Sequence, residues 1–413
     1  MTSFTFFTNC HSAATRYLGM LPCMAAFLLG LALPTSTFLV NFALVLALIC
    51  VLLKSNSHHM KVLAQHPLIW LPAIMFLLLA FSLLSQQNPY GSEMVNKYKK
   101  LLYVMPLALF FLLSRSLITY FIKGFLLANV VILVASLLIA IFHLPLGSGS
   151  PSNATVFKLH ITQNFFMALA AVIWLAQAFT HQGIKRCGYA LLVCIAIYNV
   201  FFMVEGRTGY AALIVAFIIW MFLSLSPRQK LGTAMGALVL GCILVMVPNN
   251  ASDRVKIGIE EIQRCMTATD KNSSTSCYSS MGLRTVFALR SLQLIKQAPL
   301  FGHGAGSFFY SIPAEGYSVN NPHNEYLIQT VQSGLVGLAL FLGWMLCFFC
   351  AAWQQATMVR NLFIALFSSY VVGHFFNSFL LDFSEGHLFV VLTAILASYS
   401  LPAQDIKEQE DNF

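Results

Sequence analysis

Apolar residues run along the chain in long blocks that are separated by short polar or Pro- and Gly-rich breaks. Several blocks reach the roughly 20 residues that an α-helix needs to cross a hydrocarbon core of about 30 Å. Counting the blocks between breaks predicts twelve membrane-spanning helices. Their ranges are 17–33, 37–53, 68–84, 101–113, 117–142, 163–180, 187–203, 208–225, 231–247, 329–350, 361–379 and 387–400.

The composition indicates the same fold class. Only 9% of the 413 residues are charged and 58% are hydrophobic, whereas about a quarter of the residues in soluble domains are charged. A single water-soluble core is therefore excluded, and we expect an all-α polytopic membrane protein with one long loop that contains short helices. The first block follows Arg16 and leads almost directly into the second, so we expect a retained span and no cleavable signal peptide.

These blocks divide the chain into four parts. Spans 1 to 9 occupy residues 1–247, a long polar loop occupies 248–328, spans 10 to 12 occupy 329–400, and a cytoplasmic tail occupies 401–413. Lys and Arg residues of the short connections fall on one side of the membrane if both termini are cytoplasmic. The long loop then faces outward.

Further basic residues lie on the outward side, outside the long loop: Lys97, Lys99, Lys100, Lys158 and Arg207. The loop itself adds seven Lys and Arg residues. A basic outer surface favours an anionic substrate, although charges that only solvate a loop and touch lipid headgroups are an alternative explanation.

Two segments of the long loop, 251–266 and 281–299, have apolar residues at helical spacing and are predicted to lie on the membrane surface. The second has an apolar stripe made of Val286, Leu289, Leu292 and Ile295. Residues 267–276 between the two segments are polar and turn-rich, and the Gly-rich stretch 299–313 cannot continue a helix.

Most of the ten cysteines lie in or beside apolar blocks, where cysteine behaves as a small hydrophobic residue. Cys265 and Cys277 differ because both belong to the polar loop. They would close a small ring if the loop faces an oxidising compartment, and the sequence leaves open whether they are bridged.

Polar residues gather at the outer ends of several spans, in the stretches 204–210, 322–327 and 380–387. Charged groups at this depth are costly unless they are paired or hydrated. We therefore expect them to line one common polar cavity, with Glu205, Arg207, Glu325, Asp382 and Glu385 as its charged members.

His323 has an imidazole whose unperturbed pKa of about 6.5 suits proton transfer near neutral pH. It precedes Asn324 at the start of an expected helix, whose N-terminal dipole would keep the imidazole a neutral base. A structural histidine is the alternative. His303 lies in a Gly-rich turn and could approach the same cavity or only shape the turn, whereas we interpret His374, inside a span, as a hydrogen-bond donor in helix packing.

Arg207 lies in a tight connection before a span, where it either extends toward the interface or holds phosphate oxygens with its guanidinium fork. Arg284 opens the second loop helix, and an exposed solvating charge is the alternative to a catalytic role. Arg290 is most simply a solvated or lipid-facing charge. The outward loops contain no Asp-x-Asp pair, so we expect no metal, no other cofactor and no nucleic-acid partner.

The run from His323 to Leu327, followed by Gly334-Leu335-Val336-Gly337, resembles the signature of the O-antigen ligase and polymerase superfamily of bacterial inner-membrane glycosyltransferases. The stretch APLFGHGAG at 298–306 resembles the same signature. The layout is similar as well, with about twelve spans, a long periplasmic loop between spans 9 and 10, and an arginine soon after span 7. At the level of sequence, the resemblance is confined to about Gly282–Leu340 and the Arg207 turn.

The resemblance implies that a glycan is transferred from undecaprenyl pyrophosphate to an acceptor hydroxyl, in the periplasm of a Gram-negative bacterium and without a metal. Residue by residue, it places the essential histidine of the family on His323, its two arginines on Arg207 and Arg284, and an aspartate on Asp382. Further substrate-binding candidates are Asn324, Glu325, His303 and Arg290. Gly334 and Gly337 are expected to let the helix after His323 pack closely and hold the histidine in place.

The resemblance leaves the acceptor open. A ligase uses the lipid A-core, a polymerase extends the glycan, and a protein O-oligosaccharyltransferase modifies Ser or Thr of a protein such as pilin; the ligase is favoured because the tail 401–413 is short. A lipid-linked oligosaccharide flippase would also have about twelve spans. Transporters usually place ionisable groups near the membrane midplane, whereas here they crowd the outer interface.

Overall fold

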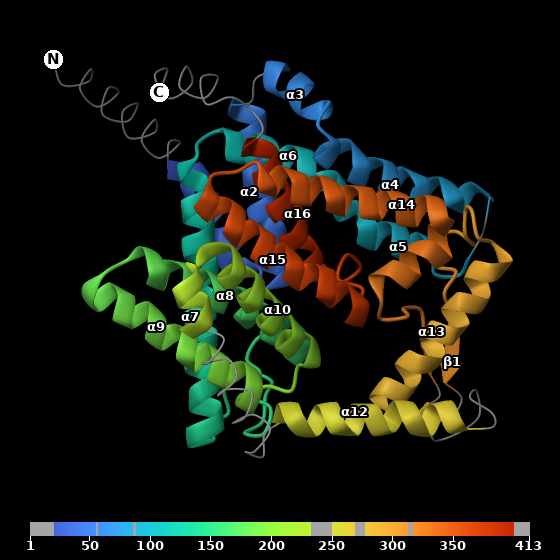
Figure 1. Ribbon diagram of the computed structural model, residues 1–413. Helices are drawn as coiled ribbons and strands as arrows, with labels where there is room; N and C mark the ends of the chain where they lie inside the picture. Colours follow the sequence, from blue (N-terminus) through green and yellow to red (C-terminus); the bar gives the residue numbers. More distant parts are fainter. Residues whose placement is uncertain are drawn as a thin grey trace, which may run out of the picture.

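The computed structural model describes residues 20–54, 57–85, 88–232, 250–268, 277–312 and 317–399. Most of them lie in helices (Figure 1). The first helices are Met20–Ala32, α2 (Thr37–Lys54), α3 (Ser57–Ala64), α4 (Pro67–Ser85), α5 (Gly91–Tyr98), the 3-10 helix η1 (Lys99–Tyr103), α6 (Val104–Leu112) and α7 (Ser116–Phe142). The middle of the chain forms α8 (His160–Thr180), α9 (Gly183–Tyr198), the π-helix η2 (Asn199–Met203), α10 (Arg207–Ser224), α12 (Asn250–Thr267) and α13 (Ser280–Gln297). The strands β1 (Tyr310–Ile312) and β2 (Tyr317–Val319) and the helices α14 (Glu325–Trp353), α15 (Thr357–Phe376) and α16 (Phe383–Tyr399) complete it.

Eight of the described helices are long and apolar enough to cross a membrane. Together with the almost wholly helical chain, this confirms an all-α polytopic membrane protein. Met20–Ala32 and α16 are apolar but shorter. The predicted span 231–247 lies almost wholly outside the described residues, and 101–113 is divided between η1 and the nine-residue α6. The number of twelve spans therefore stays a prediction.

Aromatic side chains fill the core behind the outward ends of the helices. The helices α8, α10 and α15 pack together, α14 packs against α4 and α15, and α16 packs against α6. Phe165 of α8 is fully buried, with its ring centroid 4.4 Å from that of Phe379 and 5.0 Å from that of Tyr370. Such contacts between aromatic rings stabilise a core beyond the area that they bury. The core holds the turn between α15 and α16 in place.

The two helices predicted in the long loop are present as α12 and α13 (Figure 1). In this view α12 lies across one end of the helices, and α13 begins beside the middle of α12 and runs away from it. The disulfide between Cys265 and Cys277 joins the end of α12 to the residues before α13, which resolves the question that the sequence leaves open. The intervening residues 269–276 lie outside the described part of the chain.

The buried face of α13 differs from the predicted stripe. Leu292 is 49% exposed, whereas the buried residues are Gly282, Val286, Phe287, Ser291 and Leu294. A helix has about 3.6 residues per turn, so each step of three residues falls about 60° short of a full turn. A series at strict three-residue spacing therefore rotates away from the face on which it started, so Val286 is buried and Leu292 is exposed. The placement of this helix on the membrane surface stays a prediction.

The helix α14 is kinked at Gly334, whose φ is 65°. At the kink, some backbone N–H and carbonyl groups have no partner within the helix, and the Gly-rich stretch after α13 forms hydrogen bonds with them. The N–H groups of His303 and Gly304 donate to the carbonyls of Val331 and Gln332, at 2.9 Å each. In return, the N–H groups of Leu335 and Val336 donate to Pro299 and Leu300, at 2.8 and 3.2 Å. Gly334 therefore lets α14 pack closely, as expected, but against the backbone of Leu300 and Phe301 and at a break in the helix.

Candidate functional site

Arg207 is the first residue of α10, and the preceding turn is fixed from three directions. The end of α9 widens into the π-helix η2, a feature that is frequent at functional sites. The side chain of Asn164 donates to the carbonyl of Gly206 at 3.0 Å. The backbone N–H of Glu205 donates to Oδ1 of Asn153 at 3.2 Å. The turn therefore presents Arg207 at a defined place at the N-terminal end of α10.

Arg284 lies in the first turns of α13, whose N-terminus is capped by Ser279. The hydroxyl of Ser279 accepts the N–H of Gly282 at 3.2 Å. One guanidinium nitrogen of Arg284 donates to the sulfur of Met281 at 3.8 Å. Such an N-cap typically stabilises a helix by about 1 kcal/mol, so the start of α13 is well defined.

The helix α12 connects the two arginines. A Cβ atom on Gly258 of α12 would lie 3.5 Å from the guanidinium carbon of Arg207 and 3.3 Å from Cγ of Met281. Glu261, one turn further along α12, accepts the N–H of Met281 at 3.0 Å. The surface helix therefore packs over Arg207 while holding the start of α13 beside it.

The charges of Arg207 and Arg284 interact. Burial, and then the positive charge of Arg207, lower the pKa of the Arg284 guanidinium. Within the part of the chain that the structure describes, Arg284 has no carboxylate partner. Two cations held near each other in a buried place create a strongly positive potential, which favours a multiply charged anion.

His323 lies beside Arg284 on the segment that leads into α14. Its ring centroid is 6.2 Å from that of Phe287 on α13, and its backbone has a φ of 53°. The N–H of His323 donates to Oδ1 of Asn321 at 2.9 Å. Burial, and then the charge of Arg284, lower the pKa of His323 to about 4. Burial and the charge of Arg284 therefore favour the neutral imidazole at physiological pH.

The structure thus brings together the three residues that the sequence singles out for catalysis: Arg207, Arg284 and His323. They come from α10, α13 and the start of α14, which are distant in sequence. Residues 189–342, which contain all three, match the family model described as O-antigen ligase. This segment is therefore similar to the O-antigen ligase family. No curated protein matches the chain.

The matched segment begins within α9 and ends within α14. It therefore contains the disulfide, the hairpin of β1 and β2, and the kink at Gly334. The match confirms the resemblance to the O-antigen ligase superfamily and supports an enzyme of the glycosyltransferase kind that this superfamily represents. Together with the apolar helices, it identifies a multi-pass membrane protein.

The two residues after His323 accept hydrogen bonds from backbone N–H groups. Asn324 is the N-cap of α14, and its Oδ1 accepts the N–H of Leu327 at 2.9 Å. Glu325 is fully buried, and its carboxylate accepts hydrogen bonds from Tyr98, Gln329 and the N–H of Leu380. A substrate has no access to a carboxylate in this position. The expected place of Glu325 in a polar cavity is therefore corrected.

The other histidines differ in their surroundings. His303 has a ring nitrogen 2.8 Å from the carbonyl of Leu294, so it connects the end of α13 to the kink of α14. His374 is fully buried between the rings of Tyr326, Phe341, Tyr370, Phe379 and Phe389. Its two ring nitrogens have no hydrogen-bond partner among the described residues. The interpretation of His374 as a hydrogen-bond donor in helix packing is therefore wrong. Arg290 is exposed on α13.

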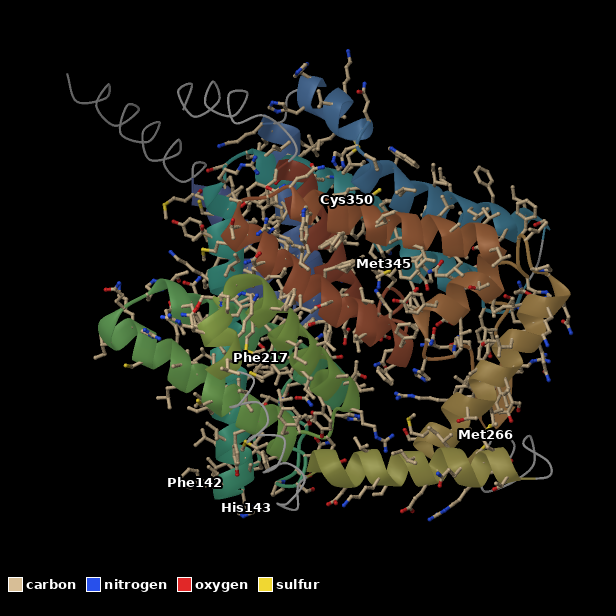
Figure 2. The ribbon with its side chains drawn as sticks, in the orientation of Figure 1. Phe142, His143, Phe217, Met266, Met345 and Cys350 are labelled. Carbon is tan, nitrogen blue, oxygen red and sulfur yellow. A yellow bond between two sulfur atoms is a disulfide. The ribbon has the colours of Figure 1, made fainter. Side chains whose placement is uncertain are left out.

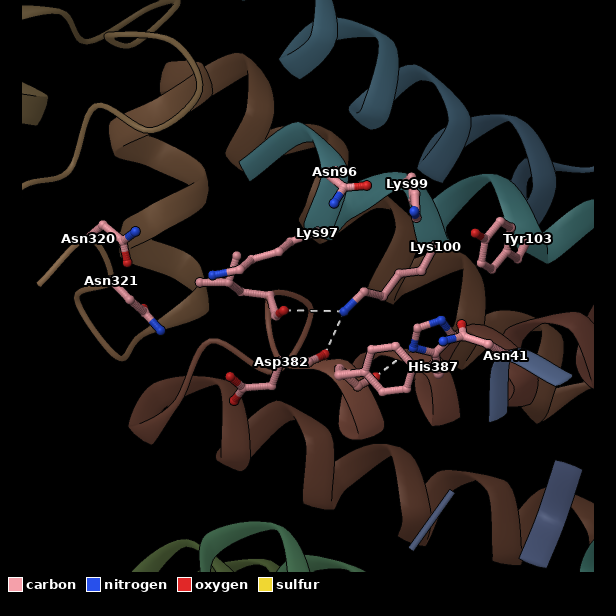
Figure 3. Close-up of a pocket in the computed structure, with 12 residues that line it drawn as sticks. Asn41, Asn96, Lys97, Lys99, Lys100, Tyr103, Asn320, Asn321, Asp382 and His387 are labelled. Atoms are coloured by element: carbon pink, nitrogen blue, oxygen red, sulfur yellow. Dashed lines mark hydrogen bonds between the residues drawn. The ribbon is translucent and has the colours of Figure 1, made fainter. Parts of the chain in front are cut away.

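Asp382 lies in a separate polar cavity of about 410 Å³ (Figure 3). Its lining includes Lys97, Lys99 and Lys100 from α5 and η1, and Asn320 and Asn321 from the segment before His323. The ammonium group of Lys100 donates to the backbone carbonyls of Leu381 and Asp382, at 3.3 and 2.6 Å. Of the charged residues expected to line one common cavity, Asp382 lines this cavity but Arg207 and Glu325 do not, so that expectation is corrected.

The sequence gives little sign of this lysine cavity. Lys97, Lys99 and Lys100 read as charges on an outer surface, yet Lys100 is only 3% exposed. The signal that could have identified it is the position of Lys100 directly before an apolar block, where a cation needs a partner. The partners are main-chain carbonyls, which no sequence motif marks.

Proposed function

We propose that this protein transfers a glycan from undecaprenyl pyrophosphate to an acceptor hydroxyl at the periplasmic face of the inner membrane, without a metal. The lipid A-core is the favoured acceptor, and a protein hydroxyl or a growing glycan is the alternative. The proposal is carried by one observation: Arg207 and Arg284 lie close enough to interact electrostatically, beside the neutral imidazole of His323. The match to the O-antigen ligase family supports it.

The proposed reaction is a single displacement at the anomeric carbon of the donor. The acceptor oxygen forms the new glycosidic bond while its proton passes to His323, and the bond from the anomeric carbon to the pyrophosphate oxygen breaks. The bonding electrons leave with the pyrophosphate, whose growing charge Arg207 and Arg284 stabilise. A single displacement inverts the configuration at that carbon.

The geometry around His323 suits a base. Among the described residues, neither ring nitrogen of His323 has a hydrogen-bond partner, so the unprotonated nitrogen is available to the acceptor hydroxyl. A pKa near 4 leaves the imidazole free to take a proton at neutral pH. It then passes the proton on to solvent, because an imidazolium beside two guanidinium groups is unstable.

The decisive experiment is glycan transfer by the purified protein in detergent, with a lipid-pyrophosphate glycan as donor. His323→Asn should lower transfer at least about 100-fold, because general-base catalysis contributes that much. Asparagine tolerates the positive φ at this position. The matched control is His143→Asn, since His143 has the same φ of 53° and caps α7.

Figure 2 shows His143 at the end of α7, where its side chain is exposed. The control variant should therefore retain wild-type transfer. Wild-type transfer in His323→Asn would refute the assignment, and a transporter would catalyse no transfer at all. In cells, loss of long-chain lipopolysaccharide on deletion of the gene would support the lipid A-core acceptor, whereas loss of a pilin mass shift would support a protein acceptor.

A further inference from the structure

The lysine cavity opens onto an apolar groove. The cavity is lined by Asn41 and Tyr103, and the same two residues line a groove of about 190 Å³ between α2 and α6. The other residues of the groove are Leu44, Val45, Ala47, Leu48, Pro106 and Leu107. All six are apolar. The positively charged cavity therefore adjoins an apolar groove.

The groove faces the place where lipid is expected. Val45 is 55% exposed and Leu48 is 45% exposed, although both lie on the membrane-spanning helix α2. Exposed apolar side chains on such a helix contact hydrocarbon chains rather than water. By the distribution of Lys and Arg, the first turns of α2 and the residues before α6 lie on the outward side of the membrane. A lipid of the outer leaflet can therefore reach the groove sideways.

The polar part of the cavity is suited to a phosphate. Lys99 is exposed, and within the described residues it has no ion-pair partner. Lys97 pairs with Glu93 at 2.6 Å, but both side chains are more than a third exposed, so an anion displaces Glu93 at little cost. Asn96, Asn320 and Asn321 add amide donors to the lining.

The acid in the cavity does not cancel these charges. Burial, and then the carboxyl of Glu385, raise the pKa of Asp382, while Lys100 acts in the opposite direction. A carboxyl whose neutral form is favoured repels an anion less. Figure 3 shows the Asp382 carboxyl on the side of the cavity facing away from the Lys100 ammonium group. Charge complementarity therefore favours an anionic group over a neutral sugar alone.

We propose that the lysine cavity and the α2–α6 groove bind a phosphorylated membrane lipid, separate from the pyrophosphate that Arg207 and Arg284 hold. The phosphate lies among Lys97, Lys99 and Lys100, and a hydrocarbon chain lies along Val45 and Leu48. This inference rests on the proposed function for its consequence, namely that this lipid is the acceptor. Asn321 lines the cavity and also accepts the N–H of His323, so a glycan on this lipid extends toward the catalytic base.

The test is lipid retention by the purified full-length protein in native mass spectrometry. Dioleoyl phosphatidic acid is the probe, and dioleoylglycerol, which lacks the phosphate, is its control. Lys97→Gln combined with Lys99→Gln should weaken retention of phosphatidic acid by about tenfold or more, because each charge-assisted hydrogen bond contributes at least about that factor. The exposed Lys296 on the outward helix α13 gives a matched control, Lys296→Gln.

The groove is tested separately. Leu48→Trp fills it and should weaken retention of phosphatidic acid by about the same factor, whereas Leu52→Trp, one turn further along α2 and 75% exposed, should leave it unchanged. Equal retention by all variants would overturn the proposal. Equal retention of dioleoylglycerol and phosphatidic acid would overturn the role of the lysines.

A second probe separates the two lipids of the reaction. Geranylgeranyl pyrophosphate should lose its binding in Arg207→Gln combined with Arg284→Gln and keep it in the double lysine variant. Loss in the double lysine variant would assign the cavity to the donor and overturn the inference of a second lipid. None of these measurements requires catalysis, so a failure of the proposed transfer reaction would appear only in the His323→Asn assay.

Discussion

His323 illustrates how position controls the chemistry of a single side chain. An exposed histidine changes its charge near pH 6.5. Here burial and the positive charge of Arg284 both disfavour the imidazolium form, so the pKa falls to about 4. The same Arg284 that is proposed to stabilise the leaving pyrophosphate therefore also keeps the base neutral. The two proposed roles of the site depend on one arrangement of charges.

This arrangement predicts the acid side of the pH profile. With a pKa of about 4, His323 stays neutral between pH 5 and 8, so kcat/KM for transfer should not fall with an apparent pKa near 6.5. Activity through His323 should decline only as the pH approaches 4. If His323 instead binds pyrophosphate as an imidazolium, kcat/KM should rise as the pH falls from 7 to 5. Profiles of the wild type and of His323→Asn, measured with the same donor, distinguish these cases.

A second prediction concerns the shape of the arginine side chain. Arg284→Lys preserves the charge but removes the planar fork that binds two phosphate oxygens at once. Transfer should fall roughly 10- to 100-fold, while the protein remains folded in detergent. Arg264→Lys is the control, because Arg264 is exposed on α12 and pairs only with Glu260 among the described residues. Equal activity of the two variants would show that charge alone suffices.

At the scale of secondary structure, the Gly-rich stretch before β1 and the kinked helix α14 form one hydrogen-bonded junction. A helix that breaks at Gly334 exposes main-chain groups, and the loop at Pro299–Gly304 binds them. This joins the end of α13 to α14, so Arg284 and His323 have a common support. His303 adds a side-chain contact to Leu294 in the same junction. The two separate glycine motifs in the sequence are thus two halves of one junction.

Gly334→Ala tests this junction. A Cβ atom at Gly334 would lie 2.2 Å from the carbonyl oxygen of Leu300, and alanine disfavours the positive φ by about 1–2 kcal/mol even without that clash. The variant should have a lower melting temperature in detergent and reduced transfer. Gly343→Ala is the matched control on the same helix, because nothing lies within 4 Å of its Cβ position. A stability of Gly334→Ala equal to that of the control would contradict the role of the kink.

The disulfide also stabilises the arrangement of secondary-structure elements, because it joins the end of α12 to the residues before α13. Cys265 and Cys277 are 12 residues apart, and a bridge over such a loop typically stabilises a structure by about 2–3 kcal/mol. Because the bridge holds α12 against α13, Cys265→Ser combined with Cys277→Ser should increase amide hydrogen exchange in α12 and lower transfer. Exchange in α8 and α15, which pack in the core, should stay unchanged. Unaltered exchange in α12 would show that packing alone holds this helix.

At the scale of the whole molecule, the sequence predicts the parts better than their arrangement. Periodicity and hydropathy locate the helices and the two loop helices, and the resemblance of the 323–327 run identifies His323 as the residue to test. The division of the polar residues into an arginine site and a lysine cavity depends on how distant segments pack. Lys100 meets the carbonyl of Asp382, and Tyr98 meets Glu325, across more than 220 residues of chain. No local pattern encodes such pairs.

Glu325 is the residue through which this arrangement is held together. Its carboxylate accepts the hydroxyl of Tyr98 on α5 at 2.8 Å and the N–H of Leu380, before α16, at 2.9 Å. The side chain of Gln329, one turn along α14, completes the set at 2.8 Å. Three regions of the fold therefore meet at one buried group, directly after the proposed catalytic histidine.

Replacement of Glu325 should consequently affect the whole protein. Glu325→Ala leaves the buried donors of Tyr98, Gln329 and Leu380 unsatisfied, and each such group costs about 1–3 kcal/mol. We expect a fall of several degrees in the melting temperature in detergent, together with loss of transfer. Tyr98→Phe removes only one of the three donors and should cost about a third as much. If Glu325 instead contacts substrate, Glu325→Ala would raise the KM for transfer while leaving the melting temperature unchanged, and measuring both quantities on the same preparation separates these roles.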